Sequence, residues 1–257
     1  MDLVEKKINE SSSQRHPWEA ARFEFFLRKI QSYIDLSSKQ YIIDVGCGDA
    51  FFIAELSKRY PNLVCVGVDI NFKQDDIAYL QTLYTGASIS LYTTLAEATS
   101  HLPRVDLVLL MDVIEHIEYD LAFLTDFILP VVQSNDALLF ITVPAFQSLF
   151  TKHDEFLGHY RRYDNRRLLQ TVTQSHFKTI QIGYFFSTLI GLRLLEKIMD
   201  RLNPKRHAEG IANWTGGKLL TSIVYQSLIV DFKVSLFLER LGIKLPGLSN
   251  YVVCRRA

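Results

Sequence analysis

The chain has 257 residues, of which 48% are hydrophobic, and its 28 basic and 28 acidic residues give a formal net charge of zero. This size and apolar content predict a folded core and exclude a globally disordered chain. The zero net charge gives no support to a protein that binds nucleic acid through bulk electrostatics, so we expect no nucleic-acid partner.

Cysteine usage and the termini bear on location. The cysteines Cys47, Cys65 and Cys254 have neither the spacing of a metal site nor that of a disulfide framework. Reduced thiols in a cytoplasmic protein are therefore expected. The N-terminal residues 1–7 have mixed charge and no apolar core, so we expect no signal peptide. The uncharged stretches 179–192 and 219–230 fall short of the ~20 apolar residues that a membrane-spanning helix needs.

The first half of the chain alternates short apolar runs with segments of helical spacing. Five apolar runs are predicted strands, at 41–45, 63–69, 88–92, 105–111 and 137–144. Predicted helices lie at 50–58, 72–84 and 122–134, with Pro130 bending or ending the last of them. This alternation predicts right-handed βαβ units and a parallel sheet that is covered on both faces.

The second half has a different texture. Residues 165–175 are predicted to be helical, 177–186 to form a sixth strand, and 251–254 to form a terminal strand. An apolar, helix-like region covers about 189–241. The predicted fold is thus an α/β, Rossmann-like, seven-stranded and mostly parallel sheet. It forms a single domain over 1–257, with a helical insertion at 188–249 before the last strand.

A glycine turn follows the first predicted strand. Gly46 and Gly48 let a ligand approach the backbone closely, and Asp69 ends the second strand, where a carboxylate can accept hydrogen bonds from ribose hydroxyls. Phe51 stands where a dinucleotide motif has its third glycine, which disfavours a pyrophosphate and hence an NAD-dependent dehydrogenase. A nucleoside without phosphates fits better, and Asp44 suits the cationic sulfonium or ammonium group of S-adenosylmethionine. The alternative is a glycine turn that binds nothing.

Four segments then resemble motifs of the class I S-adenosylmethionine-dependent methyltransferases: 44–48, 66–70, 106–117 and 139–144. The resemblance implies S-adenosyl-L-methionine as cofactor, S-adenosyl-L-homocysteine as product and the class I methyltransferase fold. The implied cofactor contacts are Asp44, Gly46, Cys47, Gly48, Asp69, Ile70, Met111, Asp112 and Val113. Among these, the glycines face the methionine part, Asp69 binds the ribose, and the 111–113 backbone lies near the sulfonium. The acid that many relatives carry after the third strand is absent before Glu97, which puts that adenine contact in doubt.

Three further segments, 16–22, 153–163 and 245–249, are similar to a bacterial methyltransferase subgroup with a His-Asp…Gly-His-Tyr-Arg-Arg-Tyr segment. Members of that subgroup are connected with envelope glycan or polyprenol-linked sugar metabolism. The resemblance therefore implies a small-molecule, glycan or lipid-linked methyl acceptor. The alternative function is a non-catalytic S-adenosylmethionine-binding or scaffold protein.

Two histidines are candidate general bases. His116 follows the fourth strand, and His159 lies in the polar segment after the fifth; an unperturbed pKa of about 6.5 suits proton abstraction near neutrality. The alternative for His116 is packing of the strand–helix turn. Asp112 and Glu115 are equally ambiguous, and with no second ligand cluster beside them we expect no metal. Arg22 is a candidate for the cofactor's carboxylate, or else a solvated arginine on a helix face.

The 153–163 segment is expected to form a lid over the acceptor. Its arginines can pair with a carboxylate or phosphate, or else the charges of a surface loop pair with one another. The residues expected to contact the acceptor are Tyr160, Arg161, Arg162 and Tyr163.

The insertion at 188–249 mixes apolar side chains with basic ones, which is typical of amphipathic helices. A hydrophobic substrate channel, a peripheral contact at the inner membrane face, a homodimer surface and ordinary packing against the sheet all fit this pattern.

Overall fold

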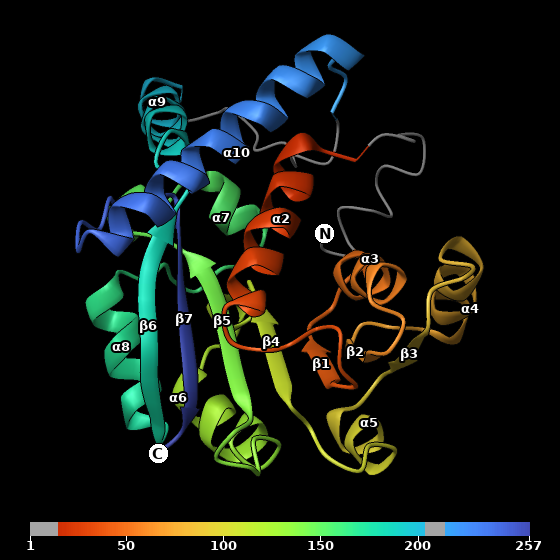
Figure 1. Cartoon of the computed structure of the whole chain (residues 1–257). Helices are drawn as coiled ribbons and strands as arrows, with labels where there is room; N and C mark the ends of the chain where they lie inside the picture. Colours follow the sequence, from red (N-terminus) through yellow and green to blue (C-terminus); the bar gives the residue numbers. More distant parts are fainter. Residues whose placement is uncertain (1–14, 204–213) are drawn as a thin grey trace.

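A central sheet organises the computed structural model, which describes residues 15–203 and 214–257 (Figure 1). Its strands are β1 (Tyr41–Val45), β2 (Val64–Val68), β3 (Ile89–Tyr92), β4 (Leu107–Met111), β5 (Leu138–Pro144), β6 (Phe177–Phe185) and β7 (Ser249–Arg256). They lie in the order β3-β2-β1-β4-β5-β7-β6. Only β7, within these described strands, runs antiparallel to its neighbours β5 and β6. The predicted seven-stranded, mostly parallel α/β fold is confirmed.

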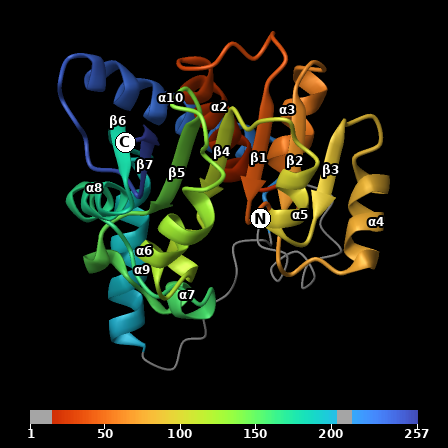
Figure 2. The same ribbon diagram turned by 90° about the horizontal axis from the view of Figure 1, so that it is seen from below.

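Helices cover both faces of the sheet (Figure 2). The described helices are α2 (Pro17–Gln31), α3 (Phe51–Arg59), α4 (Gln74–Leu83), α5 (Leu95–Ser100), α6 (Asp120–Ala122), α7 (Lys152–Phe156), α8 (Asn165–Gln174), α9 (Leu189–Leu202) and α10 (Lys218–Arg240). Short 3₁₀ turns at η1 (Ile114–His116) and η3 (Gln147–Leu149) and a π-helical turn at η2 (Phe123–Ile128) complete them.

Successive strand residues enter opposite cores, because side chains alternate across a pleated strand. Ile42 packs in a core with the buried faces of α2, α3 and α10, whereas its neighbour Ile43 packs in a second core with α5, η2 and α8. Both residues have no exposed surface. Burial on both faces is why the strands read as continuous apolar runs in the sequence.

Two segments, one before and one after β5, differ in kind from their prediction. The helix expected at 122–134 starts at Asp120, becomes π-helical, with the Leu129 amide donating to the Leu124 carbonyl at 2.8 Å, and gives way to turns at Pro130. Proline cannot continue the ladder of amide donors. The segment predicted as a loop after β5 contains α7, which begins at a capping box between Thr151 and Asp154.

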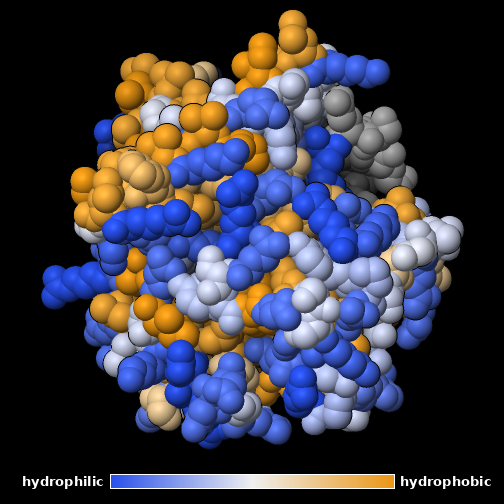
Figure 3. Space-filling view, in the orientation of Figure 1, coloured by the Kyte–Doolittle hydropathy of each residue, from blue (hydrophilic) through white to orange (hydrophobic). Residues whose placement is uncertain are grey.

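Helices α9 and α10 lie between β6 and β7, in the region of the expected insertion; its residues 204–213 lie outside the described part of the chain. α10 packs beside α2 and contributes Leu228 and Phe232 to the core, while its other side carries exposed apolar residues. Hydrophobic side chains gather where α9 and α10 lie (Figure 3). No spanning helix was expected from the sequence, but α10 is long and apolar enough to cross a membrane by length and composition alone.

Candidate functional site

The predicted site residues meet at the carboxyl edge of the parallel strands. The chain turns to opposite sides of the sheet at β1 and β4, and ligands of open α/β sheets bind at such a switch point. Figure 1 shows the arrowheads of β4 and β5 pointing to the edge near α7. The segments after β1, β2, β4 and β5 therefore share one edge.

The glycine turn after β1 is tightly built. Gly46 and Gly48 have φ of 74° and 54°, in the left-handed region that favours glycine. A Cβ atom on Gly46 would lie 2.7 Å from Cγ2 of Val113, so the turns after β1 and β4 approach each other closely. The amides of Gly46 and Cys47 donate to the Val68 carbonyl at 2.7 and 3.1 Å. The backbone at this edge is thus fixed before any ligand binds.

Asp69 braces the same turn from the end of β2. Its Oδ2 accepts a hydrogen bond from the Gly48 amide at 3.0 Å, and its Oδ1 accepts one from the Asn71 amide at 2.9 Å. A carboxylate oxygen can accept more than one hydrogen bond, so these contacts leave acceptor capacity for ribose hydroxyls. Ile70 follows with 83% of its surface exposed, which places an apolar side chain beside this carboxylate.

Asp44 is buried at the end of β1, with 1% of its surface exposed. Its Oδ1 has no hydrogen-bond partner among the described residues. Burial first, and then the charges of Asp69 and Asp49, raise the pKa of Asp44 to about 8 against the opposing charge of Arg22. Burial, followed by the charges of Asp44, Asp69 and Asp49, also raises the pKa of Cys47. A buried acid with one unpartnered oxygen has the chemistry to face a cationic group.

Arg22 reaches from α2 to the ends of β4 and β5. Its guanidinium forms an ion pair with Oδ2 of Asp112 at 2.5 Å and donates to Oγ1 of Thr142 at 3.3 Å. The Thr142 hydroxyl donates in turn to Oδ1 of Asp112 at 3.1 Å. Asp112 has a φ of 59°, which is rare for a non-glycine residue, and this network holds it there. Arg22 is not a solvated arginine on a helix face.

His116 and His159 lie next to each other although 43 positions separate them in the sequence. Their ring centroids are 4.5 Å apart in an edge-to-face arrangement. Nδ1 of His159 lies 2.9 Å from Oδ1 of Asp154. Glu115, beside His116, has no exposed surface, and burial followed by the charge of Asp112 raises its pKa well above the usual range. The Tyr160 amide donates to the Glu115 carbonyl at 2.8 Å, which joins the two segments.

Asp154 anchors the 153–163 segment. Its Oδ1 accepts from Nε of Arg162 at 2.8 Å, and its Oδ2 accepts from Arg193 at 2.7 Å and from the Thr151 amide at 2.9 Å. Burial opposes ionisation of Asp154. The hydrogen bond from His159 and the charges of Arg162 and Arg193 outweigh burial and hold its pKa below the usual range. The 153–163 segment therefore forms a wall of the site that these bonds hold in place, and its role as a lid stays a prediction.

The four predicted acceptor contacts have different surroundings. Arg162 is 3% exposed and directed to Asp154, and Tyr163 is fully buried with its hydroxyl donating to Asp120 at 2.6 Å. Arg161 pairs with the same Asp120 carboxylate at 3.1 Å, and Tyr160 is exposed. The polar groups of Arg162 and Tyr163 are thus used inside the protein, and Tyr160 is the member of the four with an exposed ring.

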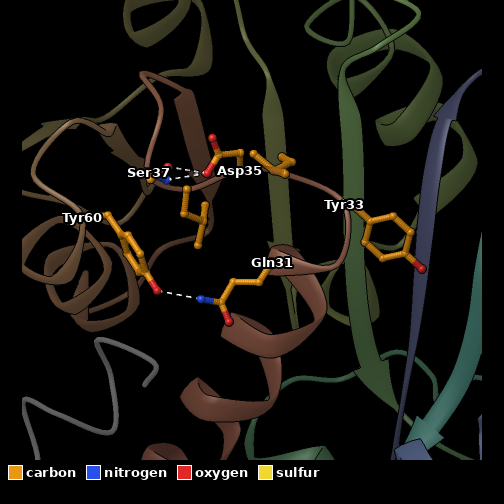
Figure 4. Close-up of a pocket in the computed structure, with 7 residues that line it drawn as sticks. Gln31, Tyr33, Asp35, Ser37 and Tyr60 are labelled. Atoms are coloured by element: carbon orange, nitrogen blue, oxygen red, sulfur yellow. Dashed lines mark hydrogen bonds between the residues drawn. The ribbon is translucent and has the colours of Figure 1, made fainter.

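A cavity of about 500 Å³ lies elsewhere, lined by residues that include Gln31, Tyr33 and Tyr60. Figure 4 shows the Gln31 amide directed to the Tyr60 hydroxyl, a hydrogen bond of 2.7 Å. None of the predicted site residues lines this cavity. We assign no role in the site to it.

Long-range partners were missed in the sequence. Thr142 and Arg193 carry no local signal, since their contacts with Asp112 and Asp154 join segments 30 and 39 positions apart. The anchoring role of Asp154 was also missed, although Arg162 and His159 lie only 8 and 5 positions away; the polar composition of 153–163 is its one signal in the sequence.

A model of the family described as "Methyltransferase domain" matches residues 18–189. No curated protein matches the chain. A SAM-dependent methyltransferase from Archaeoglobus fulgidus is 18% identical, with a TM-score of 0.53 and coverage of 99% of this chain and 98% of that one. A plantazolicin methyltransferase in complex with S-adenosylhomocysteine is 15% identical, with a TM-score of 0.56 and coverage of 99% and 88%.

A phosphoethanolamine N-methyltransferase from Haemonchus contortus, in complex with phosphomonomethylethanolamine and S-adenosylhomocysteine, is 14% identical, with a TM-score of 0.57. That match covers 99% of this chain and 56% of the other. At these identities, the likenesses to solved structures show the fold.

Proposed function

The chain belongs to the methyltransferase domain family, and on that premise we propose that it transfers the methyl group of S-adenosylmethionine to a small-molecule or lipid-linked acceptor held beside His116 and His159. The observation that carries the proposal is Asp44. Its buried and partly unpartnered carboxylate lies at the end of β1, beside the glycine turn at the switch point of the sheet. A cationic cofactor without phosphates satisfies it, and a pyrophosphate does not.

The residues at the carboxyl edge fit the parts of this cofactor. Asp44 faces its positive charge, the backbone of Gly46 and Gly48 admits it closely, and Asp69 retains acceptor capacity for ribose hydroxyls. The exposed Ile70 offers apolar surface to the base. When bound, S-adenosylmethionine supplies an activated methyl group, so the protein's work is to align the acceptor and exclude water.

His159 is suited to take the acceptor's proton. Asp154 holds Nδ1 of the ring, which directs the proton to that nitrogen and leaves Nε2 as the acceptor atom. A hydroxyl or amine acceptor would pass its proton to Nε2 as it takes the methyl group, whose bond to the sulfonium sulfur breaks to leave S-adenosylhomocysteine. Arg162 and Arg193 act through Asp154, so we assign them positioning roles.

A lipid-linked acceptor is favoured by the surface of α9 and α10. Leu192, Leu195 and Ile198 of α9 are all more than half exposed. Basic residues accompany the apolar ones on or just after the two helices, at Lys197, Lys218, Lys233, Arg240 and Lys244. Apolar and basic side chains together suit a peripheral contact with anionic lipid, which matches a cytoplasmic protein working at the inner membrane face.

Flotation of the purified protein with anionic phosphatidylglycerol vesicles tests this contact. We expect wild-type protein to float and Leu195→Glu/Ile198→Glu to stay behind. Failure of the wild type to float rejects the membrane contact. A concentration-dependent dimer that the double substitution dissociates, without flotation, supports the homodimer surface instead.

Methyl transfer itself is tested with S-adenosylmethionine deuterated at its methyl group. The protein is incubated with separate aqueous and butanol-soluble fractions of a bacterial extract, and mass spectrometry follows the label. Label in a fraction component, lost in His159→Gln and kept in the surface control His101→Gln, supports the proposal. Cofactor binding without transfer to any fraction supports the alternative of a non-catalytic binding protein.

A further inference from the structure

Folding brings three groups that ligate metals into one place. Glu115 and His116 lie on η1, His159 lies 43 positions later, and one ligand atom from each falls within 4.8 Å of the others. Ligands about 2.0–2.2 Å from a shared ion lie roughly 3–4 Å apart, so a contraction of up to about 1–2 Å lets all three groups reach one ion. The sequence shows only the adjacent pair, which is why no metal is predicted from it.

Glu115 supplies an independent observation. Its side chain has no exposed surface, and neither Oε1 nor Oε2 has a hydrogen-bond partner among the described residues. A buried carboxylate in this state costs several kcal/mol unless a cation or proton compensates it. His116 and His159, each with a ring nitrogen within 4.8 Å of a Glu115 oxygen, are metal ligands by type, while the positive charges of Arg22 and Arg162 also act on this carboxylate.

His159 is oriented as metal-binding histidines are. Its Nδ1 lies 2.9 Å from the Asp154 carboxylate, which leaves Nε2 for an ion. Metal-ligating histidines almost always give their second ring nitrogen to such a partner. Arg162, Arg193 and the Thr151 amide fix that carboxylate, so the orientation of the ring is built into the wall.

We propose that Glu115, His116 and His159 bind one divalent first-row transition-metal ion. Two imidazoles and one carboxylate leave open positions on such an ion. Glu115 closes the buried side while both histidines are partly exposed, so the open positions face the outer side of the site.

The proposed ion also indicates the chemical class of the methyl acceptor, an inference that rests on the proposed function. The open positions take one or two hydroxyl oxygens, because a bound divalent ion lowers the pKa of such a group and aligns it. The acceptor class is then a hydroxyl compound. With the ion bound, His159 would be a ligand, and the proton of the bound hydroxyl would pass to solvent. The proton-accepting role of His159 then belongs to the metal-free protein.

Cobalt(II) is the probe, because its visible absorption reports coordination without any activity. The full chain is stripped with chelator and titrated with Co²⁺. We expect one equivalent to bind with a visible ligand-field band, and excess Zn²⁺ to abolish that band. Asp154→Asn should weaken Co²⁺ binding about 10–100-fold, and His116→Gln and His159→Gln by more. The control His101→Gln, a histidine stacked on Tyr92 outside the cluster, should bind as the wild type does.

The variants separate a lost ligand from a lost fold. Glu115→Gln changes a buried side chain. If this variant fails to fold, His116→Gln, at a partly exposed residue, tests the same site. No Co²⁺ band in the wild type, or an unchanged band in both histidine variants, overturns the metal site. If the wild-type protein binds S-adenosylhomocysteine but does not bind Co²⁺, the metal site is wrong and the proposed function is unaffected. Co²⁺ binding at these residues without S-adenosylhomocysteine binding supports the metal site and contradicts the proposed function.

Discussion

Replacing Asp44 with asparagine removes a charge that the fold buries with one oxygen unpartnered. Burial first, then Asp69 and Asp49, raise the pKa of Asp44 to about 8, against about 3.9 in an unfolded chain. The folded state therefore binds this proton more tightly than the unfolded state does. Protonated Asp44 therefore contributes to the free energy of unfolding below pH ~4, and this contribution is lost as the pH rises to ~8. The loss is on the order of 5 kcal/mol, at about 1.4 kcal/mol per pKa unit.

Asp44→Asn should thus have opposite effects on the free protein and on its complex. Without ligand, urea unfolding should show the variant more stable than the wild type at pH 8.5, and the difference should shrink to about 1.5 kcal/mol at pH 5, because only about 1.1 pH units then separate the solution from the unfolded pKa. Affinity for S-adenosylmethionine should fall by about 1.5–3 kcal/mol, because the cation loses a charged partner. The reasoning is refuted if the variant is destabilised equally at both pH values, or if it binds S-adenosylmethionine as tightly as the wild type.

The remaining predictions concern the turn, the wall and the proton at Asp44. Gly86→Ala, at a φ of 86° with open space around it, should cost about 1–2 kcal/mol of unfolding free energy in urea. Gly46→Ala should cost about 1–3 kcal/mol more through its contact with Val113, and equal losses would contradict that contact. Asp154→Asn should lower the free energy of unfolding at pH 7 by about 3–5 kcal/mol, because Arg162 stays buried without its carboxylate. The gap between wild type and variant should narrow as the pH falls toward the low pKa of Asp154. An unchanged Tm would reject the anchoring role. S-adenosylhomocysteine binding at pH 7 should release close to one proton, measured by calorimetry in two buffers of different ionisation enthalpy, and Asp44→Asn should release none.

Strands were predicted from the sequence to within two residues at most ends, because burial on both faces leaves continuous apolar runs. The short helices α5 and α7 were missed, since six and five residues hold too few turns for a periodic pattern. The terminal strand was predicted too short: Ser249 and Asn250 are polar, yet both are buried by pairing with β5 and β6. Strand pairing across the chain outweighed local composition there.

The cofactor edge was predictable because its signals are local: two glycines after one strand and an acid after the next. The family match confirms the predicted enzyme class. The wall was less predictable, because a charged side chain can face solvent or a distant partner and sequence spacing does not distinguish them. Arg162 reads as an anion-binding residue but lies buried on Asp154, whose other arginine, Arg193, comes from α9.

Calorimetric titration of the purified chain with S-adenosylhomocysteine and, separately, with NAD⁺ tests the central claim most directly. The account predicts that S-adenosylhomocysteine binds at one equivalent per chain, that Asp69→Ala weakens this binding by about 1–3 kcal/mol, and that NAD⁺ gives no binding heat. Binding of NAD⁺ with no response to S-adenosylhomocysteine would contradict it.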